Sequence, residues 1–162
     1  MHNETQHRVY IETTIPSFYY TLRGDLESRA KQSWTRKWWE EYADQFTLVS
    51  SGAVIDELRS GKGEKTQKRI DLIKDLEMLP VPSQVHQIAQ TYINRLIMPK
   101  DLFGDAHHLA LASFHNTDAL LTWNCKHLAN FNKIHLIRQI NQKLGLPTPE
   151  LATPLNYLGA YD

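Results

Sequence analysis

The sequence predicts a three-layer α/β/α sandwich around a mainly parallel central sheet of four or five strands. Two observations lead to this class. Short apolar runs typical of strands alternate with longer segments of helical periodicity, which is the pattern of strand–helix–strand units. One run, Ala119 to Thr122, is continuously apolar up to its last residue, as are strands that are buried on both faces of a parallel sheet.

Length and composition are those of an ordinary globular protein. The 162 residues are expected to form a single domain, with a flexible segment at 1–7 and a C-terminal tail at 147–162. No apolar run approaches the ~18 residues of a membrane helix, so no membrane partner is expected. The polar N-terminus and the single cysteine make a cytoplasmic location the default. Because the formal net charge is zero, a polyanion would have to be bound by a local cluster of charges.

The first strand leads directly into a helix. Arg8 to Ile11 is a short apolar run that ends at Glu12. A candidate hydroxyl cap at Thr13 and a proline at position 16 suit the first helical turn, so Glu12 lies at a strand-to-helix junction. Leu26 to Phe46 then predicts a long helix with an aromatic stripe, which is found in a core more often than in an interface.

A second strand and three helices are expected next. Phe46 to Val49 is the strand, and Ser50-Ser51-Gly52 starts a helix that carries Glu57. Glu64 to Leu79 and Ser83 to Ile97 have apolar residues at helical spacing on either side of two prolines. These two segments are expected to form an antiparallel helical arm.

The last third of the chain is expected to return to the sheet. Asp105 to Phe114 is a helix rich in small residues, which allow close packing against a sheet. Ala119 to Thr122 is the buried strand, and Cys125 to Asn130 predicts a short helix. Ile134 to Ile137 is a candidate fifth strand, and a proline-punctuated tail follows from Pro147.

Four polar residues from distant parts of the chain are expected to meet at one edge of this sheet: Glu12, Glu57, Asp105 and Asn124. Ligands of parallel sheets bind outside the carboxyl ends of the strands, where Glu12 and Asn124 are expected. Hard cations such as Mg²⁺ take oxygen ligands, often carboxylates. Because converging carboxylates repel one another without a cation, metal binding should weaken as the pH falls.

Each of these residues also has an ordinary structural interpretation. Glu12 suits an exposed strand end, and Glu57 suits a helix surface. Asp105 suits a helix N-terminus, where its charge favours the helix dipole. Asn124 is a good N-cap for the predicted helix that follows it. Only the joint pattern favours a metal site.

Other catalytic and binding patterns are weak. Cys125-Lys126-His127 has no partners at zinc spacing, and His107 and His108 point in different directions on a helix. The sequence has no nucleophile elbow, phosphate-binding loop or redox Cys-x-x-Cys. One group of basic residues has the pattern usual for a solvated helix face: Lys62, Lys65, Lys68, Arg69 and Lys74.

Four motifs occur in a fixed order: an apolar strand ending in an acid and Thr, a Val-x-x-Glu-Leu helix, a Gly-Asp-Ala helix, and Leu-Leu-Thr-x-polar. In order and spacing the chain resembles a PIN domain, particularly the VapC-type toxins of bacterial toxin–antitoxin systems. The resemblance covers about Val9 to Ile137. It implies a PIN-like sandwich and hydrolysis of single-stranded RNA that depends on Mg²⁺ or Mn²⁺.

The resemblance also implies roles for individual residues. Glu12, Asp105 and Asn124 would bind the metal, directly or through water, and Glu57 would orient the attacking water. Hydroxyl groups of Thr13 and Thr122 would orient these ligands. The chain departs from the family twice: the first acid is usually Asp, and the position of Asn124 is commonly Asp. An amide lacks the charge, although its carbonyl oxygen is able to bind a metal.

The leading expectation is therefore a metal-dependent endoribonuclease, as the toxin of a toxin–antitoxin pair. Such a toxin would bind RNA and a small antitoxin, and would form a homodimer through its aromatic-rich helices. One alternative is a catalytically impaired PIN-like module that binds RNA or protein, which Glu12 and Asn124 motivate. Another is a phosphatase that forms an aspartyl-phosphate, although its usual Asp nucleophile is replaced here by Glu12.

Overall fold

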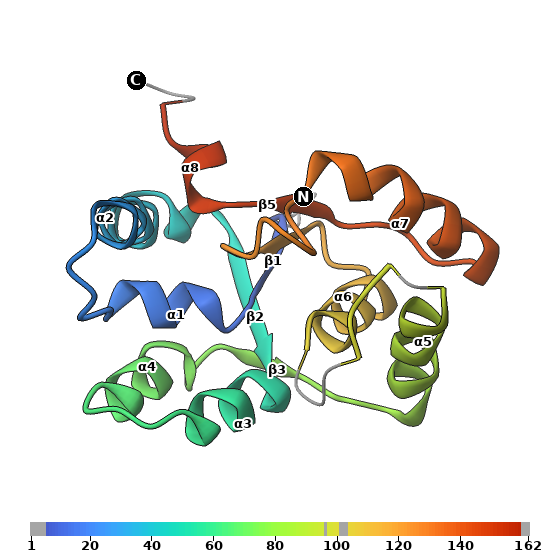
Figure 1. The fold of residues 1–162 in the computed structure, drawn as a ribbon, viewed down its shortest axis with the longest axis horizontal. Helices are drawn as coiled ribbons and strands as arrows, with labels where there is room; N and C mark the ends of the chain where they lie inside the picture. The colour runs from blue at the N-terminus through green and yellow to red at the C-terminus, as the bar shows by residue number, and fades with distance from the viewer. Residues whose placement is uncertain (1–5, 96, 101–103, 160–162) are drawn as a thin grey trace, which may run out of the picture.

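The computed structural model describes residues 6–95, 97–100 and 104–159. At its centre is a five-stranded sheet in which every pair of neighbouring strands is parallel, in the order β3-β2-β1-β4-β5 (Figure 1). The strands are β1 (Arg8–Ile11), β2 (Thr47–Ser51), β3 (Glu77–Leu79), β4 (Ala119–Leu121) and β5 (Glu150–Ala152). The predicted α/β class with a parallel central sheet is confirmed.

Helices cover both faces of the sheet and make the two outer layers (Figure 1). One layer consists of α1 (Thr14–Tyr19), α2 (Leu26–Glu41), α3 (Gly52–Ser60) and α4 (Thr66–Ile73). The other consists of α5 (Ser83–Asn94), α6 (Asp105–Phe114) and α7 (Phe131–Leu144). A short 3₁₀ helix, η1 (Ala43–Gln45), follows α2, and α8 (Pro154–Tyr157) packs against α2. Within the described ranges, no helix is long and apolar enough to cross a membrane.

The chain adds strands first on one side of β1 and then on the other, while all strands stay parallel. From β1 the chain moves through β2 to β3, then returns to β4 on the other side of β1 and ends at β5. Ile11 pairs with Leu121 at the end of the two central strands, so Glu12 and Thr122 leave the sheet side by side. Ligands of parallel sheets bind at such a switch point.

The aromatic stripe of α2 packs into the core. Trp38 is fully buried and stacks on Phe46, with 6.0 Å between the ring centroids. Trp34 stacks on Trp123 at 6.0 Å, which joins α2 to the segment after β4. The core interpretation of the stripe is confirmed, whereas the homodimer through these helices stays a prediction.

The predicted helix from Glu64 to Leu79 is too long. Its helical part, α4, ends at Ile73, and Glu77–Leu79 is strand β3, which pairs with β2. Pairing in the sheet outweighs the local helical spacing of these residues. Because β3 separates α4 from α5, these helices lie on opposite faces of the sheet (Figure 1) and form no antiparallel arm.

The predicted strand from Ile134 to Ile137 is also wrong, because these residues lie inside α7. The local signals of that helix are clear: the side chain of Asn130 caps its first turn, and Gly145 ends it in a left-handed conformation with φ of 71°. Ile137 is buried, so the short apolar run is one face of a helix. Four residues of such a run do not distinguish a strand from a buried helix.

Three further predictions concern the C-terminal tail, the segment after β4 and the N-terminus. The fifth strand is Glu150–Ala152, which lies inside the predicted tail, and Cys125 to Asn130 forms turns where a short helix was expected. The predicted flexible segment 1–7 lies mostly outside the described residues.

A buried amide connects α7 to its neighbours. Asn141 is fully buried, accepts a hydrogen bond from the Tyr92 hydroxyl of α5, and donates to Ser113 Oγ of α6 at 3.1 Å. It also donates to Thr148 Oγ1 at 3.0 Å, in the segment that leads into β5. This network fixes the packing of one whole helical layer against the edge of the sheet.

We expect Asn141→Ala to lower the free energy of unfolding by about 2 to 4 kcal/mol, because buried hydroxyls lose their partner and a cavity opens. Urea unfolding followed by circular dichroism measures this. The matched control is Asn132→Ala, an exposed position on the same helix, which should change stability by less than about 0.5 kcal/mol. Equal stability of the two variants would contradict the importance of the network.

Candidate active site

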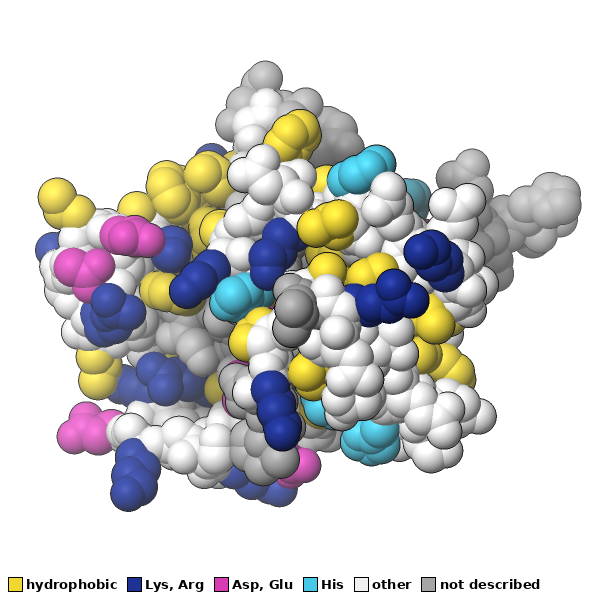
Figure 2. Space-filling model, turned by 45° about the vertical axis from the view of Figure 1, so that its right-hand side comes forward, with side chains coloured by type: hydrophobic (Ala, Val, Ile, Leu, Met, Phe, Trp, Pro, Cys, Tyr) yellow, Lys and Arg dark blue, Asp and Glu magenta, His cyan; other side chains and the backbone are white. Residues whose placement is uncertain are grey.

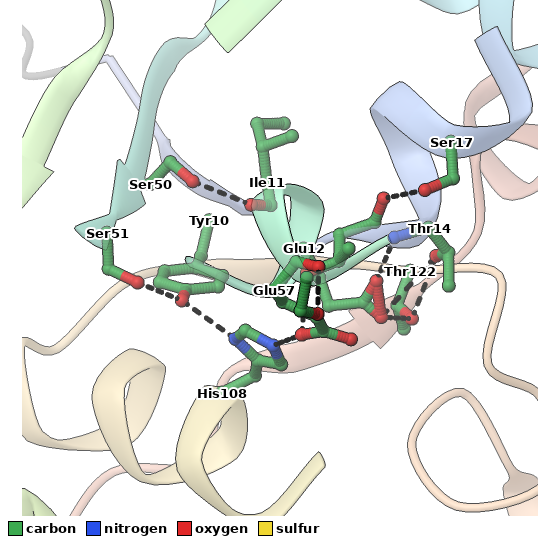
Figure 3. A network of polar contacts seen from close by, with 12 residues as sticks. Tyr10, Ile11, Glu12, Thr14, Ser17, Ser50, Ser51, Glu57, His108 and Thr122 are labelled. Carbon is green, nitrogen blue, oxygen red and sulfur yellow. Dashed lines mark hydrogen bonds and ion pairs between the residues drawn. The ribbon is translucent and has the colours of Figure 1, made fainter. Parts of the chain in front are cut away.

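Glu12 lies at the end of β1, where its side chain is only 2% exposed. Its carboxylate accepts hydrogen bonds from the backbone N–H of Thr14 and, at 2.7 Å, from the Thr122 hydroxyl (Figure 3). The backbone N–H of Glu12 donates to the carbonyl of Leu121 at 3.2 Å. The ends of β1 and β4 are thus joined through both main chain and side chain. The exposed strand end suggested for Glu12 is wrong.

Glu57 reaches the same edge from α3. One of its carboxylate oxygens, Oε2, accepts a hydrogen bond from the Thr13 hydroxyl at 2.8 Å and lies 2.8 Å from His108 Nε2 (Figure 3). The side chain of Glu57 is 32% exposed. Its Oε2 is therefore fixed by two contacts, while the group still faces solvent.

His108 is a functional candidate that the sequence did not reveal. It is 2% exposed, and its Nδ1 lies 3.0 Å from the Tyr10 hydroxyl, which is in turn 2.7 Å from Ser51 Oγ. A chain of polar contacts therefore runs from the end of β2 to Glu57 (Figure 3). One signal was available: His108 follows Asp105 by three residues, so both lie on one face of a helix.

The electrostatics of the site centre on His108. Burial raises the pKa of Glu12, and the charge of His108 acts in the opposite direction. Burial also raises the pKa of Asp105, opposed by His108 and by a hydrogen bond from Asn124. For His108 itself, burial lowers the pKa, but the hydrogen bond to Glu57 and the nearby carboxylates outweigh it, so the pKa is raised. When protonated, His108 is a positive charge among three carboxyl groups.

Asp105 and Asn124 complete the edge. Asp105 is the first residue of α6, and its carboxyl group interacts with Glu57 and with the side chain of Asn124. The Asn124 oxygen accepts hydrogen bonds from the backbone N–H groups of Lys126 and His127 at 3.2 and 3.0 Å. Since the oxygen caps this turn, the amide nitrogen is the group that donates to Asp105. The capping interpretation of Asn124 therefore holds, for a turn in place of a helix.

The chemistry of these residues fits a hard cation, although hydrogen bonds already hold two of the carboxylates. Among the described residues, no group of three or more His, Cys, Asp or Glu side chains is placed to hold a metal ion. Two of the carboxylates are already held by hydrogen bonds, Glu12 by Thr122 and Glu57 by His108. Buried carboxyl groups with raised pKa values are nevertheless those that a cation stabilises, and their oxygens are suitable ligands for Mg²⁺ or Mn²⁺.

No family model matches this chain, and no curated protein does. Among solved structures, it is similar to the crystal structure of VapBC2 from Rickettsia felis bound to a DNA fragment from their promoter. The TM-score is 0.53 and the identity 17%, over 74% of this chain and 89% of that chain. The chain has a PIN-like fold. FitAcB from Neisseria gonorrhoeae has a TM-score of 0.49 and 14% identity, over 72% of this chain and 88% of that chain.

Ionised Glu12 destabilises the fold. Folding raises the pKa of this carboxyl group above its ordinary value of 4.5. With respect to this group, the folded protein is therefore most stable below pH 4.5, where the group is protonated in both the folded and the unfolded chain. It loses stability as the pH rises through the pKa of the group in the folded protein. We expect Glu12→Gln to remove this loss, so that stability falls less than in the unchanged protein as the pH rises above 4.5.

Urea unfolding across this pH range, in buffer without divalent cations, measures the difference. Glu41→Gln, at an exposed position, is the control and should keep the pH dependence of the unchanged protein. The same pH dependence in Glu12→Gln would show that burial of this carboxyl group carries no cost.

Proposed function

We propose that the chain is a metal-dependent endoribonuclease that hydrolyses single-stranded RNA, and that it is the toxin of a toxin–antitoxin pair. The main support is the convergence of Glu12, Glu57, Asp105 and Asn124 from four segments at the switch point of a parallel sheet. Under this proposal the protein acts in the cytoplasm, binds a small antitoxin that covers the site, and forms a homodimer.

Glu12 and Asp105, with Asn124 directly or through water, would hold Mg²⁺ or Mn²⁺. When bound, such an ion polarises the phosphate and lowers the pKa of an attacking water. The protein supplies the orientation of the ligands: Thr122 and the N–H of Thr14 fix the Glu12 carboxylate in one position. Capping by Asn124 fixes the turn beside Asp105.

Glu57 is placed to orient the water. Both of its contacts end on Oε2, and no described residue donates to Oε1, which therefore remains able to accept a hydrogen bond from water. The contact with His108 Nε2 at 2.8 Å holds the carboxylate in this orientation. A fixed, partly exposed carboxylate within reach of a water molecule is suited to general-base catalysis.

Asp105→Asn should lower the rate of RNA cleavage on the order of 100-fold, because a charge that acts on the transition state is removed. The initial rate on a labelled single-stranded RNA, with Mg²⁺ or Mn²⁺, measures it. Asp75→Asn, at an exposed position, is the control and should leave the rate unchanged. Cleavage in excess chelator at the same rate in both variants would contradict the proposed mechanism.

A second candidate is a PIN-like module that binds RNA or protein and has impaired catalysis. Two observations favour it: the oxygen of Asn124 caps a turn, and His108 lies against Glu57, where its raised pKa favours a positive charge beside the carboxylates. In such a module the site would be stable without a metal.

Asn124→Asp separates the two candidates. Asp also caps turns, so the variant should keep the fold while adding a charge beside Asp105. For the nuclease, we expect Mn²⁺ to bind the unchanged protein and to bind the variant about tenfold more tightly, as measured by titration calorimetry. If Mn²⁺ binds to neither protein, the binding module is the better description.

A further inference from the structure

A cavity lined by charged side chains lies in the layer of helices that carries Glu57. It has a volume of about 360 Å³ and is lined by four basic residues and one acid: Arg23, Lys62, Lys65, Arg69 and Glu64. Four positive charges and one negative charge leave a net of three positive charges in one cavity, in a chain whose formal net charge is zero. In Figure 2, Lys and Arg side chains border the hollow at the left of the molecule.

Two helices, α1 and α3, connect the cavity to the candidate active site. Its walls come from the segment after α1 and from the connection between α3 and α4, and α4 packs against both helices. Thr13, at the start of α1, contacts Glu57 on α3. At ~1.5 Å per residue, α1 spans about 9 Å, so the cavity lies on the order of 10 Å from Glu57.

Arg69 has a donor that the protein leaves unpaired. Its Nε is buried, and no described residue accepts its hydrogen. Buried N–H groups without a partner are rare because they cost free energy, unless a ligand supplies the acceptor. An arginine guanidinium binds phosphate through two parallel N–H groups, and the side chain of Arg69 lines the cavity.

The other charges of the cavity are also available. Within the described ranges, Lys62 and Lys65 form no salt bridge, whereas Lys31 and Lys74 pair with acids on or beside their own helices. Arg23 contacts Asp25 at 3.5 Å, but both side chains are exposed, and water and salt weaken such pairs.

We propose that this cavity binds a backbone phosphate of the RNA strand whose scissile phosphate occupies the active site. This assignment rests on the proposed function and names the part of the protein that holds the strand beyond the point of cleavage. Arginine and lysine contacts to phosphate position a nucleic acid without reading its bases. The cavity therefore contributes affinity that is strongly dependent on salt and independent of sequence.

The test measures binding separately from cleavage. Fluorescence anisotropy of a short labelled single-stranded RNA is recorded in chelator, on an Asp105→Asn background. Adding Arg69→Gln or Lys65→Gln should weaken binding several-fold and reduce the slope of log affinity against log salt by about 0.7 for each phosphate that is no longer neutralised. Lys68→Gln is the matched control: Lys68 is exposed, is next to Arg69 on α4 and does not line the cavity.

Thermal unfolding of each variant is measured beside its affinity, and Lys65→Gln changes a side chain that forms no salt bridge with any described residue. Equal RNA affinity and equal salt slope in Arg69→Gln, Lys65→Gln and the control would overturn the proposal. A second result would also overturn it: Arg69→Gln abolishes binding of inorganic phosphate but leaves RNA affinity unchanged. The cavity would then be a site for free phosphate.

Failure of this site and failure of the nuclease give different results. RNA binding that depends on Arg69, without any metal-dependent cleavage, supports the cavity and rejects the proposed enzyme. Metal-dependent cleavage with a KM that Arg69→Gln and Lys65→Gln leave unchanged supports the enzyme and rejects the cavity.

Discussion

The pairing of β1 with β4 is the constraint on which the candidate site depends. These two strands are far apart in sequence, yet Ile11 and Leu121 are paired at their ends. The next residues, Glu12 and Thr122, are therefore neighbours, and the hydroxyl of Thr122 fixes the carboxylate. Helices that start at this edge, α3 and α6, bring Glu57 and Asp105 to the same place.

Gathering carboxyl groups in a partly buried place costs free energy, and the positive charge that His108 carries when protonated offsets part of this cost. His108 contacts Glu57 and stabilises the charged forms of Glu12 and Asp105. Hydrogen bonds between His108 and Tyr10, and between Tyr10 and Ser51, connect this histidine to the strands of the core. The same network ties the orientation of Glu57 to the packing of α6 against the sheet.

Under the proposed function, the site at the switch point and the basic cavity have separate tasks. The buried carboxyl groups carry the chemistry at the switch point of the sheet, while the cavity at Arg69 holds the strand from outside it. The two are linked by α1 and α3, whose contact through Thr13 and Glu57 sets their separation. Under this proposal RNA binding does not require a positive net charge, because four basic side chains line one cavity.

Local signals in the sequence are enough to establish the class of the fold and the four polar residues of the edge. Apolar runs and capping residues act over a few neighbouring positions, which is why β1, β4 and α6 lie where they were predicted. The strand at Glu77–Leu79 and the edge strand at Glu150–Ala152 depend on the folded chain, because each is held by pairing with a strand distant in sequence.

The same reason separates the site residues. Strand ends reveal Glu12 and Asn124, but a histidine shows its role only when Glu57 and Tyr10 lie against it. Arg69 likewise looked like part of a solvated helix face, and its unpaired Nε exists only because neighbouring segments fold over it. The sequence determines which chemical groups are present and which local structures they favour. The burial of a side chain and its hydrogen-bond partners depend on contacts that form only in the folded chain.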